Sequence, residues 1–216
     1  MINMINMDLP KKILVFPLSN FIIFPKTTVP LNIFEPRYIQ MIDDSMKSNR
    51  YIGMIQPKKT GDLKKPDLYN IGCVGKITSF NETEDGRYLI VLNGLCRYET
   101  IKEISSNKLY RECEVNFKTF VNDLVEKKEQ IEFSDLKQIF KDLKKLFEQQ
   151  GYQISWKDLE KQSVEQTINT LSMASPFTLE EKQILLETKN LIERKNKLEE
   201  ILITYTNHNF TNKTIQ

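Results

Sequence analysis

Apolar and polar positions follow different periods in the two parts of the chain. Up to about residue 120 the apolar runs are short, and six of the seven glycines and seven of the eight prolines lie among them. Because glycine and proline separate strands and turns, this part is expected to be mainly β. Beyond it, apolar residues recur every three or four positions, which is typical of amphipathic helices. The predicted domains are therefore residues 1–120 and residues 121–216, the second ending in a polar tail.

The first part contains one helix signal among several strand signals. Pro36 suits the first position of a helix of about three turns. Residues 56–70 are expected to form a polar loop, and Asp85-Gly86 the tip of a hairpin. Alternation near the end of this part predicts a strand that places Glu112 on a wet face. The predicted strands are 13–16, 29–34, 51–56, 71–80, 88–93 and one around 113–117.

The second part shows three amphipathic helical patterns. They run from Phe133 to Phe147, from Ser155 to just before Pro176, and from Leu179 to about Tyr205. Gly151 is placed to end the first helix, and Thr178 with Glu181 forms a T-x-x-E capping box for the third. Such helices need a partner surface to bury their stripes. The sequence therefore predicts an α+β fold, a small curled sheet or β pseudobarrel with one inserted short helix, followed by a C-terminal bundle of about three helices.

Charge and hydropathy narrow the classes of partner. The 31 Lys and Arg residues nearly balance the 29 Asp and Glu residues, so no strong field attracts nucleic acid or an anionic membrane. Apolar runs such as 13–16 and 21–24 are far too short to span a bilayer. The N-terminal residues do not show the charged and apolar pattern of a secretion signal. We expect a cytoplasmic protein with no membrane association, for which nucleic acid is a less favoured partner.

The sequence contains few residues or motifs that could carry out catalysis or bind a cofactor. His208 is the single histidine, and the three cysteines are widely spaced among apolar neighbours, as small core residues would be. Neither a Walker A pattern nor a GxGxxG pattern occurs. An S-x-x-K match at 134–137 follows a K-T-G match at 59–61, which reverses the order in β-lactamases. We therefore expect no enzyme activity, no metal and no cofactor.

The most distinctive stretch is PLNIFEPRYIQMI at 30–42. Here a strand meets a helix, with Glu35 and Arg37 on either side of a proline. A buried carboxylate requires a cation or backbone donors. If the corner is buried, Glu35 is expected to pair with Arg37, Arg87 or Arg97, and the sequence leaves this choice open. We interpret the corner as an ion pair that fixes strand to helix rather than as a ligand site.

Three stretches of the chain resemble one known family. FPLSNFIIFPKTTVPLNIFEPRY at 16–38 resembles the opening of the Lon N-terminal, or LON substrate-binding, domain. IGCVGKITSF at 71–80 and EDGRYLIVLNGLCRYE at 84–99 resemble its next hairpin, and ASPFTLEEKQILLE at 174–187 resembles the helical tail of stand-alone members. The matching motif residues, expected to be structural, are Pro30, Phe34, Glu35, Pro36, Arg37, Tyr38, Gly72, Gly75, Asp85, Gly86, Arg87, Gly94 and Arg97.

The resemblance implies both a fold and a function. The fold is a PUA-like β pseudobarrel followed by helices, as the residue pattern also predicts. The implied function is non-catalytic recognition of unfolded or partly folded polypeptides, without the ATPase and protease domains of full-length Lon. A separately encoded protease is a further partner that the resemblance leaves open. Two alternatives remain: an RNA-binding PUA-like module, and a domain that holds a small ligand in the barrel.

One apolar run is a candidate for contact with polypeptides. Phe21, Ile22 and Ile23, followed by Phe24, lie in what is expected to be a connecting segment between two strands. Apolar side chains exposed in such a segment would mark an interaction site. The alternative, which the sequence favours, is that these side chains belong to the core. Exposure of these residues therefore separates the two interpretations.

Overall fold

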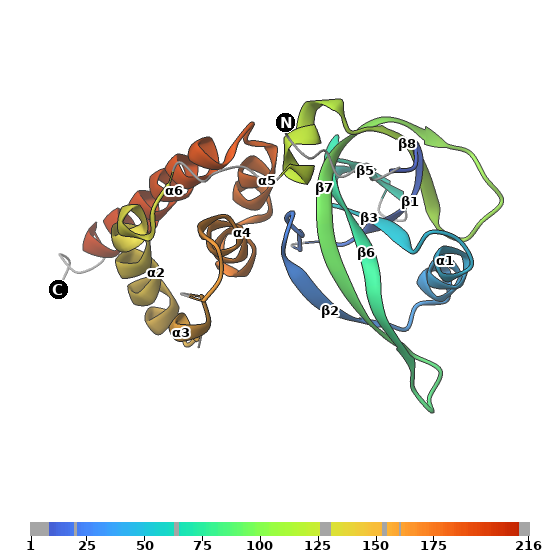
Figure 1. Cartoon of the computed structure of the whole chain (residues 1–216), viewed down its shortest axis with the longest axis horizontal. Helices are drawn as coiled ribbons and strands as arrows, with labels where there is room; N and C mark the ends of the chain where they lie inside the picture. The colour runs from blue at the N-terminus through green and yellow to red at the C-terminus, as the bar shows by residue number, and fades with distance from the viewer. Residues whose placement is uncertain are drawn as a thin grey trace. The chain divides into compact units, whose positions relative to one another are not determined.

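The computed structural model in Figure 1 describes residues 9–19, 21–62, 65–125, 131–152, 155–159 and 161–211. Internal contacts divide the chain into two units, Met1–Glu126 and Lys127–Gln216. The division comes slightly later than the predicted boundary at residue 120, because a 3-10 helix, η1, packs against the sheet unit before the chain leaves it.

The first unit is built around a six-stranded sheet in the order β2-β7-β6-β3-β1-β8, with a further pairing between β7 and β8. This extra pairing closes a ring of β1, β3, β6, β7 and β8, so the predicted pseudobarrel is confirmed. The strands are β1 Lys12–Pro17, β2 Thr28–Ile33, β3 Tyr51–Ile55, β6 Ile71–Glu82, β7 Tyr88–Ile104 and β8 Arg111–Asn116. The 17 residues of β7 allow it to pair with β2 near its start and with β8 near its end.

Tyr98 of β7 fills the interior of the ring. Its side chain is fully buried, and its hydroxyl donates to the Met54 carbonyl oxygen at 3.3 Å. A Cβ on Gly72 would lie 2.5 Å from this hydroxyl, and one on Gly53 would lie 2.8 Å from it. Two strands therefore carry glycine where the tyrosine ring lies between them. Because a large side chain occupies this space, the structure gives no support to a small ligand at this level of the barrel.

Helix α1, Pro36–Met46, begins as the sequence predicts. Pro36 occupies the first turn, where its missing N–H costs nothing, and Glu35 is the N-terminal capping residue in an extended conformation. The buried face of α1 carries Tyr38, Met41 and Ile42. These apolar positions recur at helical spacing and hold the helix against the sheet.

Two expectations for the sheet unit are wrong. The predicted polar loop at 56–70 contains a hairpin of β4, Pro57–Asp62, and β5, Lys65–Leu68. The Arg111 guanidinium donates to the Pro66 carbonyl oxygen at 2.7 Å, a contact from a distant strand that local sequence does not reveal. Glu112, predicted to face water, is 2% exposed because ammonium groups of Lys12 and Lys108 cover its carboxylate at 3.1 and 3.5 Å.

The helical content of the second unit is confirmed, but two predicted helices are each divided. The observed elements, with η1 of the first unit, are η1 Lys118–Leu124, η2 Phe133–Leu136, α2 Lys137–Gln149, α3 Trp156–Leu159, α4 Val164–Ala174, α5 Leu179–Glu187 and α6 Leu191–Thr211. Ser163 forms a capping box with Gln166 and starts α4 afresh. The Asn190 side chain accepts from the Glu193 N–H at 2.9 Å and starts α6. Within the described residues, no helix has the length and apolar character needed to cross a membrane.

Candidate interaction surface

The corner at the end of β2 lies on the surface. Phe34 is 66% exposed, and Arg37 donates to Glu35 at 2.8 Å with both side chains nearly half exposed. Glu35 therefore pairs with Arg37, and the pair lies on the surface, so the condition of a buried corner is not met. Because Ile33 turns into the core, the next side chain in the extended backbone points outward. Of this motif, Tyr38 is buried, and its ring lies 4.3 Å from that of Phe16.

Two neighbouring carboxylates of α1 accept hydrogen bonds from tyrosines that are distant in the sequence. The Tyr88 hydroxyl of β7 donates to Asp43 at 3.0 Å, and the Tyr110 hydroxyl donates to Asp44 at 2.6 Å. Lys108 lies 3.2 Å from Asp44. The hydrogen bond from Tyr110 lowers the pKa of Asp44, and burial raises the pKa of Tyr110 to about 12. The sequence suggested solvated carboxylates here, because neither tyrosine is near them in the chain.

The strands β2, β7 and β6 form a three-stranded region whose outer side is open. Across it, Pro30 lies opposite Val91, and Asn32 lies opposite Leu89. Leu89 is 44% exposed, Val91 is half-buried, and exposed Phe34 follows at the end of β2. These apolar side chains and their polar neighbours form what we call the outer face. The polar strand residues of the outer face are Thr28, Asn32, Asn93, Lys76, Thr78, Ser79 and Asn81.

The outer face is nearly free of charge. Among its strand residues Lys76 is the one ionisable side chain, although charged residues make up 28% of the chain. Hydroxyl and amide side chains of the outer face form hydrogen bonds with each other; for example, the Thr28 hydroxyl donates to Asn93 Oδ1 at 3.0 Å. Apolar side chains beside uncharged amides suit contact with another polypeptide better than contact with a phosphate backbone.

The connecting segment before β2 is buried rather than exposed. Ile22 and Ile23 are 3% and 1% exposed, so the exposure expected of them is not observed. A Cβ on Gly94 would lie 2.0 Å from the Phe24 carbonyl oxygen, which shows how closely this segment approaches β7. Phe21 is half-buried and keeps part of its ring accessible. Binding of polypeptide at Phe21 stays a prediction, while the burial of the two isoleucines places them in the core.

The motif glycines and the hairpin tip have local structural causes. Gly86 has a positive φ of 79°, which the turn between β6 and β7 requires. Asp85 and Arg87 form an exposed ion pair at 2.8 Å across this turn. A Cβ on Gly75 would lie 2.6 Å from the Leu92 side chain, so glycine makes room for a core leucine.

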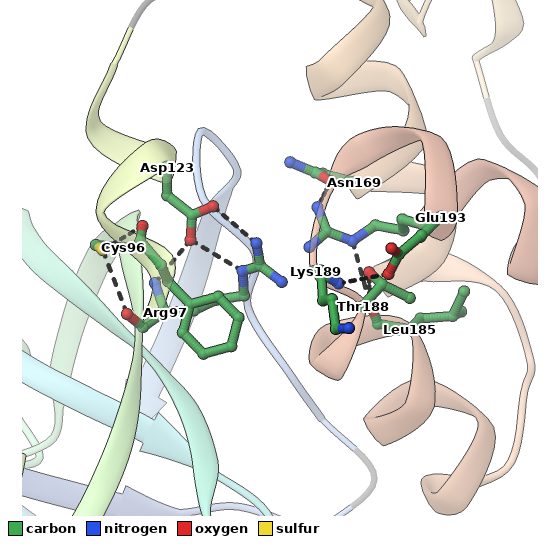
Figure 2. Close-up of polar contacts among 10 residues, drawn as sticks. Cys96, Arg97, Asp123, Asn169, Leu185, Thr188, Lys189 and Glu193 are labelled. Carbon is green, nitrogen blue, oxygen red and sulfur yellow. Dashed lines mark hydrogen bonds and ion pairs between the residues drawn. The ribbon is translucent and has the colours of Figure 1, made fainter. Parts of the chain in front are cut away.

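Arg97 forms a buried ion pair at the end of the sheet unit. Its guanidinium donates to both carboxylate oxygens of Asp123 at 2.9 and 2.8 Å, and its backbone N–H donates to the same side chain at 3.0 Å. The side chains are 3% and 9% exposed, and Figure 2 shows Asp123, a residue of η1, facing Arg97 of β7. The guanidinium also lies 4.2 Å from the Phe120 ring centre. Arg97 therefore fixes η1 rather than pairing with Glu35.

Comparison with known proteins identifies the family to which this architecture belongs. The family model described as the ATP-dependent protease La (LON) substrate-binding domain matches residues 12–204. The chain belongs to the LON substrate-binding domain family.

Individual relatives of this LON domain are Lon proteases. The chain is 25% identical over 195 residues to the Lon protease of Dictyoglomus thermophilum, covering 88% of this chain and 24% of that protein. It is 27% identical over 186 residues to Lon protease 1 of Bdellovibrio bacteriovorus, covering 85% and 23%. The chain thus spans about a quarter of the length of these curated relatives.

Solved structures show the same fold. The N-terminal domain of Mycobacterium avium complex Lon protease superposes with a TM-score of 0.63 at 18% identity, covering 89% of this chain and 98% of that one. The Lon N-terminal domain protein from Xanthomonas campestris gives 0.62 at 17% identity, covering 89% and 97%.

Within the helical unit of this LON domain, a buried arginine ties three helices together. Arg194 of α6 donates to the Leu185 carbonyl oxygen at 3.0 Å and to Asn169 Oδ1 at 2.6 Å. The Thr188 hydroxyl donates to the same Leu185 oxygen at 2.9 Å (Figure 2). This cluster explains how the helix can end after α5 and a new one begin at α6 while the two stay packed together. The spacing of residues in the sequence did not predict this cluster.

Proposed function

We propose that this LON domain is a non-catalytic module that binds exposed segments of unfolded or partly folded polypeptides through the outer face. The observation that carries the proposal is the exposure of Phe34 (66%), at the end of β2, together with that of Leu89 (44%) on a nearly uncharged sheet surface. Exposed apolar side chains gathered on one surface are typical of interaction sites. Membership of a substrate-binding family supports the same kind of ligand.

The titratable groups of the sheet unit support a binding role rather than a catalytic one. Burial raises the pKa of the Tyr110 hydroxyl to about 12 and that of the Cys113 thiol to about 11, so both groups are even harder to ionise at neutral pH than an ordinary tyrosine or cysteine. Burial likewise raises the pKa of Cys96. A nucleophile needs a depressed pKa or an adjacent base, and these groups are shifted the other way.

Delivery of bound polypeptides to a separately encoded protease is part of the proposal. Its support is that the relatives matched over most of this chain are named Lon proteases. In this proposal this chain binds the polypeptide, and the partner hydrolyses its peptide bonds.

The test is a fluorescence-anisotropy titration of a labelled, permanently unfolded polypeptide with the purified protein. Saturable binding with a Kd of about 1–10 μM that persists at high salt is expected, because apolar burial depends little on ionic strength. Phe34→Ser should weaken binding severalfold. Ile101→Ser is the matched control, since Ile101 is 59% exposed but lies on the later half of β7.

Salt dependence separates polypeptide binding from RNA binding. An RNA-binding module would bind single-stranded RNA with an affinity that falls steeply as salt is added, because phosphate contacts release counterions. Tight, salt-sensitive RNA binding together with no binding of the unfolded polypeptide would replace the proposed function by the RNA alternative.

A further inference from the structure

The hydrogen-bonding pattern of β2 shows which of its backbone groups face away from the sheet. The Gly94 N–H donates to the Thr27 carbonyl oxygen at 2.8 Å, next to the pair Thr28 and Asn93. In an antiparallel ladder this bond makes Thr28 a non-hydrogen-bonded position, and such positions recur at every second residue. The N and C=O groups of Thr28, Pro30 and Asn32 therefore point away from β7.

β2 is an open edge. In the described six-stranded sheet it is the one strand with a single neighbour, because β8 pairs with both β1 and β7. Thr28, Pro30 and Asn32 are exposed. Proteins usually protect such edges with charged side chains, bulges or proline. β2 has no charged residue and no register shift against β7, so Pro30 is its only protection of this kind.

We propose that an extended segment of the bound polypeptide adds to β2 as a further strand, a mode of binding that rests on the proposed function. The edge offers outward N–H groups at Thr28 and Asn32 and outward carbonyl oxygens at all three positions. Every polypeptide carries the complementary backbone groups, so strand addition explains recognition without a fixed sequence. The uncharged side chains of β2 repel neither acidic nor basic segments.

Pro30 limits the strength of this pairing. It supplies a carbonyl oxygen but no N–H, so an added strand loses one bond in the middle of the edge. The same missing donor weakens pairing between the β2 edges of two copies. An edge with one gap suits reversible capture of a client better than permanent assembly.

The first experiment measures whether binding depends on backbone N–H groups in alternate register. The probes are short labelled peptides of alternating Val and Thr, N-methylated at single positions along the chain. Strand addition predicts that methylation weakens binding at every second position only, because the intervening N–H groups face away from β2. Each effective methylation should cost about fivefold or more in Kd, the value of one net hydrogen bond. Equal effects at all positions, or none, would overturn the proposal.

The second experiment changes the edge itself while keeping its side-chain character. Pro30→Ala restores the missing N–H and should tighten binding of the peptide about fivefold. Asn32→Pro removes an outward N–H and should weaken it by a similar factor. Asn32→Ala, which keeps the N–H and removes the side chain, is the matched reference, and Asn32→Pro should bind the peptide about fivefold more weakly than this variant does. Unchanged Kd values in both Pro30→Ala and Asn32→Pro would refute strand addition.

The outcomes distinguish this mode of binding from the proposed function. If unfolded polypeptide binds but neither N-methylation nor Pro30→Ala matters, the function stands and side chains of the outer face alone account for it. If no polypeptide binds, the proposed function itself fails. If wild-type protein sediments as a dimer that Asn32→Pro disrupts, the edge is occupied by a second copy and the proposal is overturned.

Discussion

Two arginines of the sheet unit provide a direct test of what burial does to an ion pair. Arg97 and Asp123 lie 2.8 Å apart, and so do Arg37 and Glu35. The first pair is at most 9% exposed, whereas the second is over 40% exposed. We predict that Arg97→Met strongly destabilises the protein and that Arg37→Met has little effect.

The magnitudes follow from the contacts that remain. In Arg97→Met, Asp123 keeps the backbone N–H at 3.0 Å and loses both guanidinium bonds, so a nearly buried carboxylate is left without its cation. Removing one partner of such a pair costs about 3–5 kcal/mol. An exposed pair contributes about 0.2–1 kcal/mol, which is the expected cost of Arg37→Met. The double variant with Asp123→Leu should be less destabilised than the sum of its single variants, because no charge is left buried.

Urea unfolding followed by far-UV circular dichroism measures these differences. Trp156 is the single tryptophan and lies in the second unit, so its fluorescence reports whether the helices unfold together with the sheet. Because the chain has two units, each transition should be fitted separately. Equal destabilisation by Arg97→Met and Arg37→Met would refute the reasoning from burial. Asp123→Asn, a milder change, provides the same comparison if Arg97→Met does not fold.

Three further predictions concern the interior of the sheet unit and its surface helix. Gly72→Ala should destabilise the protein by about 1–3 kcal/mol in urea unfolding, because its Cβ would overlap the Tyr98 hydroxyl; an unchanged midpoint would contradict the packing described. Asp44→Asn should lower the free energy of unfolding by under about 1 kcal/mol at neutral pH. It should also make that free energy fall less in acid, because the stability that comes from the lowered pKa of Asp44 is lost as the pH drops below 3.8, the ordinary pKa of aspartate. Thiol labelling at mildly alkaline pH should be slow until the protein unfolds, because all three thiols are buried and burial raises the pKa of Cys96 and that of Cys113, the latter to about 11; fast labelling of the folded protein would refute it. The three cysteines are Cys73, Cys96 and Cys113.

Local signals predicted much of the fold because they act within a few residues. Pro36 starts α1, and Thr178 with Glu181 forms the capping box of α5, as the spacing indicated. The positive φ of Gly86 lies at the predicted hairpin tip. These residues determine the conformation of their own segment, so no knowledge of distant contacts is needed to interpret them.

Long-range contacts caused the failures. Glu112 lies in a strand whose alternation predicts exposure, but Lys12 of the distant strand β1 covers its carboxylate together with Lys108, four residues before it. The hairpin at 57–68 depends on Arg111 from β8. At the candidate surface, Ile22 and Ile23 were candidates because they lie outside the predicted strands, yet the glycine in β7 that lets their segment approach is about 70 residues away.

The motif residues near β2 divide according to what their side chains contact. Tyr38 packs in the core, and Pro36 starts α1, so their substitution is expected to act through stability. Phe34 packs much less against the rest of the fold, because two thirds of its surface faces solvent. A change there can alter binding while the unfolding midpoint stays constant. The edge of β2 has the same property at Asn32, whose N–H faces away from the sheet. Function and folding can therefore be separated by experiment within a stretch of seven residues, 32–38, in which the sequence alone indicated only structural roles.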